Sequence, residues 1–111
     1  MINEYKYGIF KIDNRIYHDD IKLLGTRVRF WECRDREVRL KDIQDLLSMS
    51  PQVVVIGLGA GGLVSVSAEV RDALRMRRII MIAEKNQPAV EAYNKALTDG
   101  KKVAAIFPSR G

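Results

Sequence analysis

The sequence predicts an α/β fold in a single domain spanning residues 1–111. Three observations support this. The length of 111 residues is close to that of one typical domain. Residues 1–40 consist mainly of short apolar segments separated by turn residues, a pattern typical of β-hairpins. Residues 41–111 alternate helical and strand patterns, beginning with a helix and continuing as strand, helix, strand, helix, strand.

The first part of the chain is predicted to form short strands joined by tight turns. Apolar segments occur at residues 7–12, 16–17 and 28–31. Residues 13–14 (Asp-Asn) and 25–26 (Gly-Thr) separate them, and Asn, Asp and Gly tolerate the left-handed backbone of hairpin turns. These segments are therefore interpreted as β-hairpins.

A short helix is predicted at residues 41–48. Ile43, Leu46 and Leu47 recur at helical spacing, so they share one apolar face. Pro51 stops the pattern, because the residue before a proline is disfavoured in a helix.

Three buried strands are predicted in the second half of the chain. Residues 53–56 form a continuous β-branched run, which suits a strand covered on both faces. Residues 79–82 and 103–107 have the same character. A helix opening at Pro88 and ended by Gly100 separates the last two strands.

The helix between the first two of these strands begins near a serine. Either Ser65 or Ser67 can cap it, and Glu69 then lies in its first turn, where the helix dipole favours a negative charge. Its apolar face includes Val70 and Leu74. The strand–helix–strand crossover is expected to be right-handed.

A glycine-rich turn follows the first buried strand and carries the clearest binding motif of the chain. Gly57, Gly59 and Gly62 match the dinucleotide fingerprint G-x-G-x-x-G. Its backbone amides can hold an anionic phosphate, with Ser65 nearby, and Glu84 ends the next strand, where an acid can bond a ribose hydroxyl.

Two features favour a different interpretation of this turn. The capping serines come after the motif, whereas a true fingerprint starts its helix within it. Glu84 also lies farther along the chain than the roughly 20 residues typical of the fingerprint. The alternative is a tight strand-to-helix connection in which glycine is needed for positive φ or close packing.

The remaining chemical candidates favour structural roles. His18, Asp19 and Asp20 can form an acid/base or metal cluster, but neighbouring side chains point apart, and a turn with solvated carboxylates is preferred. Cys33 has no histidine near it in sequence and is interpreted as inert. Trp31 and Tyr93 are assigned to the core or its edge.

Composition excludes several classes of protein. No uninterrupted apolar stretch approaches the length of about 18 residues that a membrane-spanning helix needs. Cys33 is the only cysteine, so no internal disulfide can form, and a cytoplasmic location is expected.

The net charge is +5. Basic and aromatic residues alternate over residues 27–41, but acidic side chains dilute the pattern, and nucleic-acid binding is disfavoured.

Several segments together resemble a small domain family that includes an adipogenesis-associated protein and a mitochondrial complex I assembly factor, with many uncharacterised archaeal and bacterial members. The resemblance covers nearly the whole chain. It is carried by residues 7–9 (Tyr-Gly-Ile), 17–21 (Tyr-His-Asp-Asp-Ile), 51–59 (Pro51 and the strand ending in Ile-Gly-Leu-Gly), 92–94 (Ala-Tyr-Asn) and 100–106 (Gly-Lys-Lys-Val-Ala-Ala-Ile).

The resemblance implies a three-layer α/β domain with a mixed central sheet and an additional N-terminal β layer. It supplies no catalytic residues. The chain departs from the family at its last residues, where many members have a His-x-Thr-Cys tail and this chain has residues 108–111, Pro-Ser-Arg-Gly. Asn86 stands where the family commonly has Thr, and it is expected to cap the following helix.

The functional prediction is a non-enzymatic interaction or assembly-type protein with protein partners, no cofactor and no metal site. A homo-oligomer formed through a β edge or a helix face remains open. The alternative is a nucleotide or anion-binding protein that uses the glycine-rich turn at residues 57–62, with Ser65 and Glu84 beside the ligand.

Overall fold

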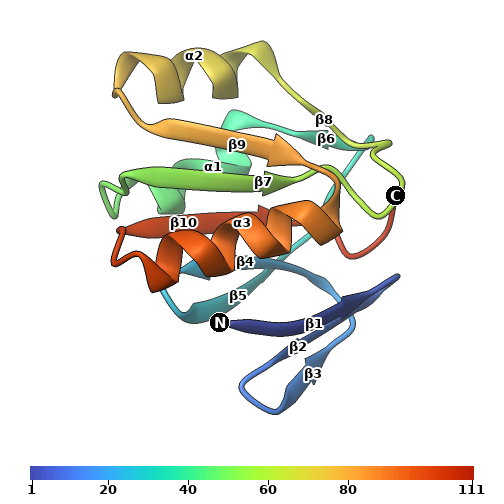
Figure 1. Ribbon diagram of the computed structural model, residues 1–111. Helices are drawn as coiled ribbons and strands as arrows, with labels where there is room; N and C mark the ends of the chain where they lie inside the picture. The colour runs from blue at the N-terminus through green and yellow to red at the C-terminus, as the bar shows by residue number, and fades with distance from the viewer.

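The strands are divided between a central five-stranded sheet and two smaller sheets (Figure 1). The computed structural model describes residues 1–111. Its strands are β1 (Ile2–Lys6), β2 (Ile9–Ile12), β3 (Arg15–Tyr17), β4 (Asp20–Leu24), β5 (Arg27–Trp31), β6 (Glu37–Val38), β7 (Val53–Gly57), β8 (Ser65–Val66), β9 (Ile80–Glu84) and β10 (Val103–Phe107). Its helices are α1 (Leu40–Leu47), α2 (Ala68–Met76) and α3 (Asn86–Thr98).

The central sheet is mixed, with the strand order β5-β4-β10-β7-β9. Strands β10, β7 and β9 are parallel to one another, whereas β4 is antiparallel to both β10 and β5. The parallel part is the strand–helix alternation that the sequence predicts. In the antiparallel part, β5 contains the predicted segment 28–31, whereas β4 lies between the predicted segments 16–17 and 28–31.

Helices and a small sheet cover the two faces of the central sheet. Helices α1 and α2 contribute buried side chains to one core cluster, and α3 packs with β1 and β2 in the other. Strands β1, β2 and β3 form an antiparallel sheet beside α3 (Figure 1). This confirms the α/β fold with a mixed central sheet and an additional N-terminal β layer. That layer contains β1 to β3 only, because β4 and β5 join the central sheet.

The alternation of side chains along β7 explains its uninterrupted apolar run. Val53 and Val55 belong to the core cluster with α3, while Val54 and Ile56 belong to the cluster with α1 and α2. All four are buried, because a central parallel strand is covered on both faces.

The turn between β2 and β3 forms as the sequence predicts. Asp13 has φ 49° and Asn14 has φ 67°, so both central residues of this two-residue turn are left-handed. Such turns match the twist of the flanking strands, which is why Asp and Asn are favoured there.

Two predicted elements differ from the structure. Ile80 is 58% exposed because β9 lies at the edge of the central sheet, so this strand is not buried as expected. The last helix starts at Asn86 rather than at Pro88, with Lys85 in the N-cap position. The expectation that Asn86 caps this helix is therefore wrong: its side chain is fully buried and bonds to two other segments.

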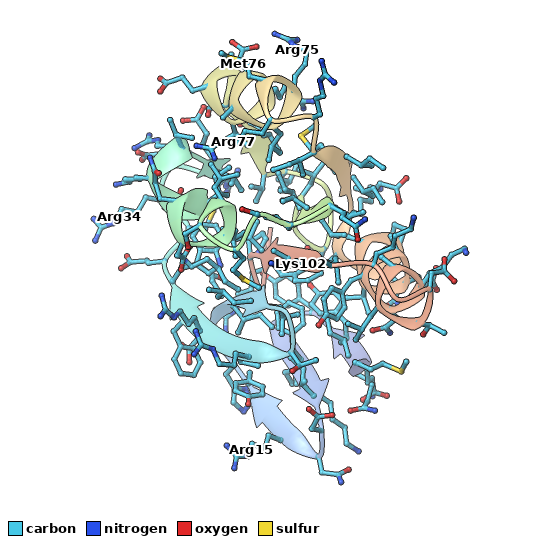
Figure 2. The ribbon with its side chains drawn as sticks, turned by 90° about the vertical axis from the view of Figure 1, so that its left-hand side faces the viewer. Arg15, Arg34, Arg75, Met76, Arg77 and Lys102 are labelled. Atoms are coloured by element: carbon cyan, nitrogen blue, oxygen red, sulfur yellow. The ribbon has the colours of Figure 1, made fainter.

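Basic side chains project from many parts of the surface (Figure 2). Arg15 comes from β3, Arg34 from the segment after β5, and Arg75 from α2. In this view Arg75 lies at the top, Arg34 at the left and Arg15 at the bottom, so these three basic side chains are far apart on the surface.

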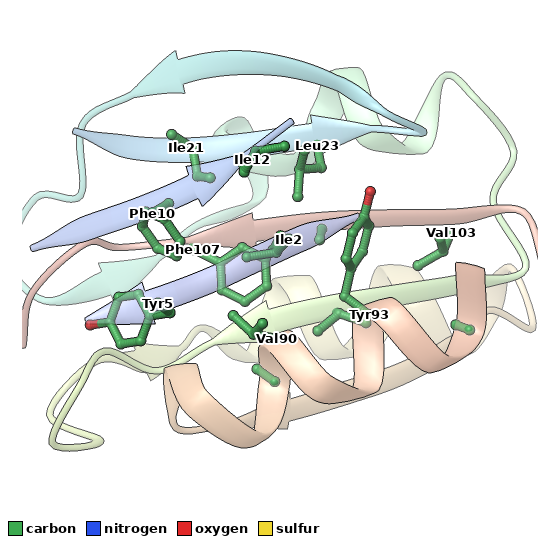
Figure 3. Close-up of a cluster of buried hydrophobic side chains, with 14 of the residues drawn as sticks. Ile2, Tyr5, Phe10, Ile12, Ile21, Leu23, Val90, Tyr93, Val103 and Phe107 are labelled. Atoms are coloured by element: carbon green, nitrogen blue, oxygen red, sulfur yellow. The ribbon is translucent and has the colours of Figure 1, made fainter. Parts of the chain in front are cut away.

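The core between the N-terminal sheet and α3 is rich in aromatic side chains (Figure 3). The Phe10 ring lies 4.8 Å from that of Tyr5 and 5.6 Å from that of Phe107, measured between centroids. Tyr93 is fully buried, and its hydroxyl donates a hydrogen bond to the carbonyl of Gly25 at 2.8 Å. These contacts hold β1 and β2 against β10, and α3 against the turn between β4 and β5.

Candidate functional site

The glycine-rich loop leaves β7 at the carboxyl end of the parallel strands and packs tightly against its surroundings. A Cβ atom at Gly57 would collide with the Asn86 side chain and the Phe107 ring. Gly59 has φ +88°, and a Cβ there would collide with the backbone of Gly111. Glycine is therefore required at both positions by close approach, and at Gly59 also by the left-handed backbone.

Half of the backbone N–H groups from Leu58 to Leu63 bind within the protein. The N–H of Leu58 donates to the carbonyl of Glu84 at 2.8 Å, and that of Gly61 donates to the carbonyl of Gly111 at 2.8 Å. The N–H of Gly59 donates to Oδ1 of Asn86 at 3.1 Å. The N–H groups that lack an acceptor in the chain belong to Ala60, Gly62 and Leu63.

The structure brings together some of the residues predicted for a nucleotide site and separates others. Gly57 pairs with Glu84 across β7 and β9. Gly62 has φ +78° and lies against the Lys85 side chain. Ser65 lies in β8, where its hydroxyl is 3.4 Å from the carbonyl of Arg36.

Helix α2 begins after the glycine-rich loop rather than within it. Its first residue is Ala68, and Ser67 caps it by accepting a hydrogen bond from the N–H of Val70 at 3.3 Å. A dinucleotide fingerprint starts its helix inside the glycine motif, so that the free helical amides face the pyrophosphate. Here the two-residue strand β8 intervenes.

A hollow of about 760 Å³ lies between this loop, the C-terminal residues and the segment after β5. Figure 1 shows the chain end beside the loop that follows β7. Ligands of α/β proteins commonly bind at the carboxyl ends of parallel strands, which is the position of this hollow. Its lining residues are Tyr7, Asp20, Cys33, Arg36, Ala60, Gly61, Leu63, Val64, Pro108, Ser109, Arg110 and Gly111.

Both carboxylate oxygens of Asp20 accept hydrogen bonds. Oδ1 accepts hydrogen bonds from the N–H of Ser109 at 2.7 Å and from its hydroxyl at 3.2 Å. Oδ2 accepts one from the N–H of Cys33 at 2.8 Å. Asp20 thus joins the start of β4 to the segments after β5 and β10. Its role differs from that of the solvated turn carboxylate expected from the sequence.

The thiol of Cys33 lies in the hollow but is unreactive. Burial, with smaller contributions from the carboxylates of Asp20 and Asp42, raises the pKa of Cys33 to about 11. The reactive form of cysteine is the thiolate, so the side chain is protonated and a poor nucleophile at neutral pH.

Two arginines in the hollow have no acidic partner. Arg36 has φ 50° in the turn after β5, and neither it nor Arg110 takes part in an ion pair. The guanidinium carbon of Arg110 lies 6.0 Å from the centre of the Tyr7 ring. The hollow therefore contains two guanidinium groups that are not paired with a carboxylate.

Asn86 holds the walls of the hollow together, and the sequence analysis missed this role. Its Oδ1 accepts from Gly59 and its Nδ2 donates to the carbonyl of Pro108, so it joins the loop after β7 to the segment after β10. Both bonds are buried. The sequence shows an asparagine near the start of the helix, but it does not reveal its bonding partners, because they are far away along the chain.

The other candidate clusters form no chemical site. His18 and Asp19 are exposed, and no group of three or more His, Cys, Asp or Glu side chains can hold a metal ion. Within the basic segment, Arg39 pairs with Asp35 and Glu37, in each case at 2.9 Å.

A separate exposed surface lies along β5, an edge strand of the central sheet. Phe30 is 62% exposed, and its ring centroid lies 6.0 Å from that of Tyr17. Ile16, 60% exposed, is adjacent to Tyr17 in β3. We refer to Ile16, Tyr17 and Phe30 as the aromatic edge.

None of the helices is long and apolar enough to cross a membrane. No curated protein matches the chain.

Solved structures of similar fold cover nearly the whole chain. A conserved hypothetical protein from Pyrococcus horikoshii has a TM-score of 0.89 at 18% identity and covers 100% of this chain and 99% of its own. A protein from Bartonella henselae described as an outer membrane protein has a TM-score of 0.86 at 22% identity, with coverages of 99% and 94%. A Mth938-like domain from Bordetella pertussis has a TM-score of 0.67 at 17% identity, with coverages of 100% and 86%.

A family described as "Protein of unknown function (DUF498/DUF598)" matches residues 2–108, which include every strand and helix of the domain. The chain therefore belongs to the DUF498/DUF598 family.

Proposed function

We propose that the protein is a non-enzymatic interaction or assembly-type protein that binds a protein partner at the aromatic edge. The exposed side chain of Phe30 beside Tyr17, on a strand with a neighbour on only one side, is the observation that carries this proposal. Large aromatic side chains are enriched among the residues that dominate binding energy at protein interfaces.

An open strand edge gives such a partner a backbone to pair with. Strand β5 bonds only to β4, so its other edge is available for an additional strand. In this binding mode the backbone provides affinity and side-chain contacts provide specificity. Phe30 and Tyr17 would supply those contacts.

The charges around the aromatic edge favour an acidic partner segment. Arg15 and Arg27 flank it, both are exposed, and neither takes part in an ion pair. The net charge of +5 opposes the association of two copies. The proposed occupant is therefore an extended acidic segment of a different protein.

Two further arguments support an assembly role. The sequence resembles a family that includes an adipogenesis-associated protein and a complex I assembly factor, and assembly factors act by binding other proteins. The thiol in the hollow, in addition, is not an activated nucleophile, because Cys33 is protonated at neutral pH. We place the protein in the cytoplasm, where a lone cysteine stays reduced.

Site-specific photocrosslinking in the native cell tests the proposal. A photoreactive phenylalanine analogue replaces Phe30 in one variant and Ile80 in the control. Ile80 is a matched control because it is 58% exposed on β9, the opposite edge of the same sheet. Crosslinked peptides are sequenced, and the partner is then purified and titrated against the wild type, Phe30→Ser and Ile80→Ser.

The proposal predicts one predominant partner crosslinked from position 30 through an acidic segment. Its affinity should fall about tenfold or more in Phe30→Ser and stay unchanged in Ile80→Ser. The same proteins at both positions, no crosslink at position 30, or a crosslink to a second copy of this chain would each overturn it.

A further inference from the structure

We propose that the hollow beside the glycine-rich loop binds the phosphate group of a small phosphate monoester. The geometry points to Arg36 and Arg110 as the charged donors and to the backbone N–H groups of Ala60 and Leu63 as neutral donors. All four residues line the same hollow. This function is separate from protein binding at the aromatic edge.

The balance of charge and hydrogen-bond donors in the hollow favours an anion. Arg36 and Arg110 have no carboxylate partner, and the N–H groups of Ala60 and Leu63 have no acceptor in the chain. Asp20 is the only acidic side chain in the lining, and its oxygens accept three hydrogen bonds from Ser109 and Cys33. Guanidinium groups and backbone N–H groups are the donors that commonly hold phosphate.

The rest of the lining suits the organic part of such a ligand. Leu63 is 60% exposed and Tyr7 is 66% exposed, although both border the hollow. Their side chains can cover an apolar or aromatic group attached to the phosphate. The volume of about 760 Å³ is within the range of about 300–1,000 Å³ usual for small-molecule sites.

The proposed site uses the glycine-rich loop differently from a dinucleotide fold. The N–H groups of Gly59 and Gly61 bond within the protein, so the free donors among the residues that line the hollow are those of Ala60 and Leu63. Ser65 and Glu84 do not line the hollow, and Arg36 and Arg110 supply the charge instead. The helix dipole that a dinucleotide fold employs makes no contribution, because α2 starts at Ala68.

Calorimetric titration of the full chain with AMP, FMN and inorganic phosphate at low salt tests the site. The variants Arg36→Gln and Arg110→Gln each remove one proposed donor. Arg34→Gln is the matched control, because it removes the same charge from an exposed residue that pairs with Glu32 outside the hollow. All three residues are exposed, so the variants are expected to fold.

Saturable binding of AMP or FMN should weaken about tenfold or more in Arg36→Gln and in Arg110→Gln, but not in Arg34→Gln. Inorganic phosphate alone should bind more weakly, because it lacks the organic group that contacts the side chains of Leu63 and Tyr7. On ligand addition, the ¹H–¹⁵N signals of Ala60 and Leu63 should move more than that of Gly61. The absence of saturable binding by every probe, or equal weakening in Arg34→Gln, would overturn the proposal. Phe30→Ser should leave ligand binding unchanged.

Discussion

Asn86 connects two segments that form the walls of the hollow, and its side chain has no exposure to solvent. Replacing it with alanine would leave the N–H of Gly59 and the carbonyl of Pro108 without partners. Each unsatisfied buried group costs about 1–3 kcal/mol. We therefore expect Asn86→Ala to lower the free energy of unfolding by about 2–4 kcal/mol, measured by urea denaturation.

Gln87→Ala is the control for this substitution, because Gln87 is exposed in the same turn of α3. It should change stability by less than about 0.5 kcal/mol. Equal effects of the two substitutions would contradict the bridging role of Asn86.

Tyr93 makes stability sensitive to alkaline pH. Burial raises its pKa to about 12, with a smaller contribution from the Asp13 carboxylate, whereas an unfolded tyrosine ionises near 10. The stabilising contribution of the neutral hydroxyl is therefore complete below about pH 10 and is lost as the pH rises towards 12. The unfolding free energy should fall by about 2–3 kcal/mol across this interval because of Tyr93.

Urea denaturation at a series of pH values compares the wild type with Tyr93→Phe. The variant lacks the hydroxyl that bonds to Gly25, so it should be less stable at neutral pH by about 1 kcal/mol. It should also lose less stability between pH 10 and 12. Some alkaline loss should remain, because burial also raises the pKa of Tyr5. Parallel pH profiles for the two proteins would contradict the assignment.

At the scale of elements, the start of α2 distinguishes two serines that the sequence leaves equivalent. Ser67 accepts the N–H of Val70, while Ser65 lies in β8. Loss of an N-cap side chain costs about 1 kcal/mol. Ser67→Ala should therefore destabilise the protein by about 1 kcal/mol in thermal or urea unfolding, and Ser65→Ala by less than about 0.5 kcal/mol. The reverse order would show that the helix begins earlier in solution.

The elements with strong local patterns were predictable from the sequence. Strand β7 can be identified from its continuous β-branched run, because a strand covered on both faces is apolar throughout. Helix α1 can be identified from the helical spacing of its apolar residues. Strands β6 and β8 have two residues each, too short to show alternation. Only the pairing of these distant segments defines them as strands.

The arrangement of the hairpins and the details of the site depend on contacts distant in sequence. The hairpin strands before α1 have similar sequence patterns, yet β4 pairs with β10 and β1 does not. Tertiary packing determines which of them joins the central sheet. The glycine-rich loop was identified from its sequence. Whether its backbone N–H groups are bonded within the protein depends on Asn86 and Gly111, and no local sequence pattern reveals these contacts.

At the scale of the whole molecule, the two proposed surfaces lie on different parts of one domain. The aromatic edge follows an outer strand of the central sheet, whereas the hollow lies at the carboxyl ends of its inner strands β7 and β10. The separation predicts that substitutions at Phe30 and at Arg36 act independently. The two proposals therefore predict that a protein partner and a small anion can bind at the same time.

Hydrogen exchange of the complex with the crosslinked partner is the most direct test of the central claim that β5 is the docking strand. Backbone amides of Arg27–Trp31 should exchange more slowly in the complex than in the free protein, while those of Ile80–Glu84 should not change. Protection confined to β9 or to the helices, with β5 exchanging at its free rate, would contradict the claim.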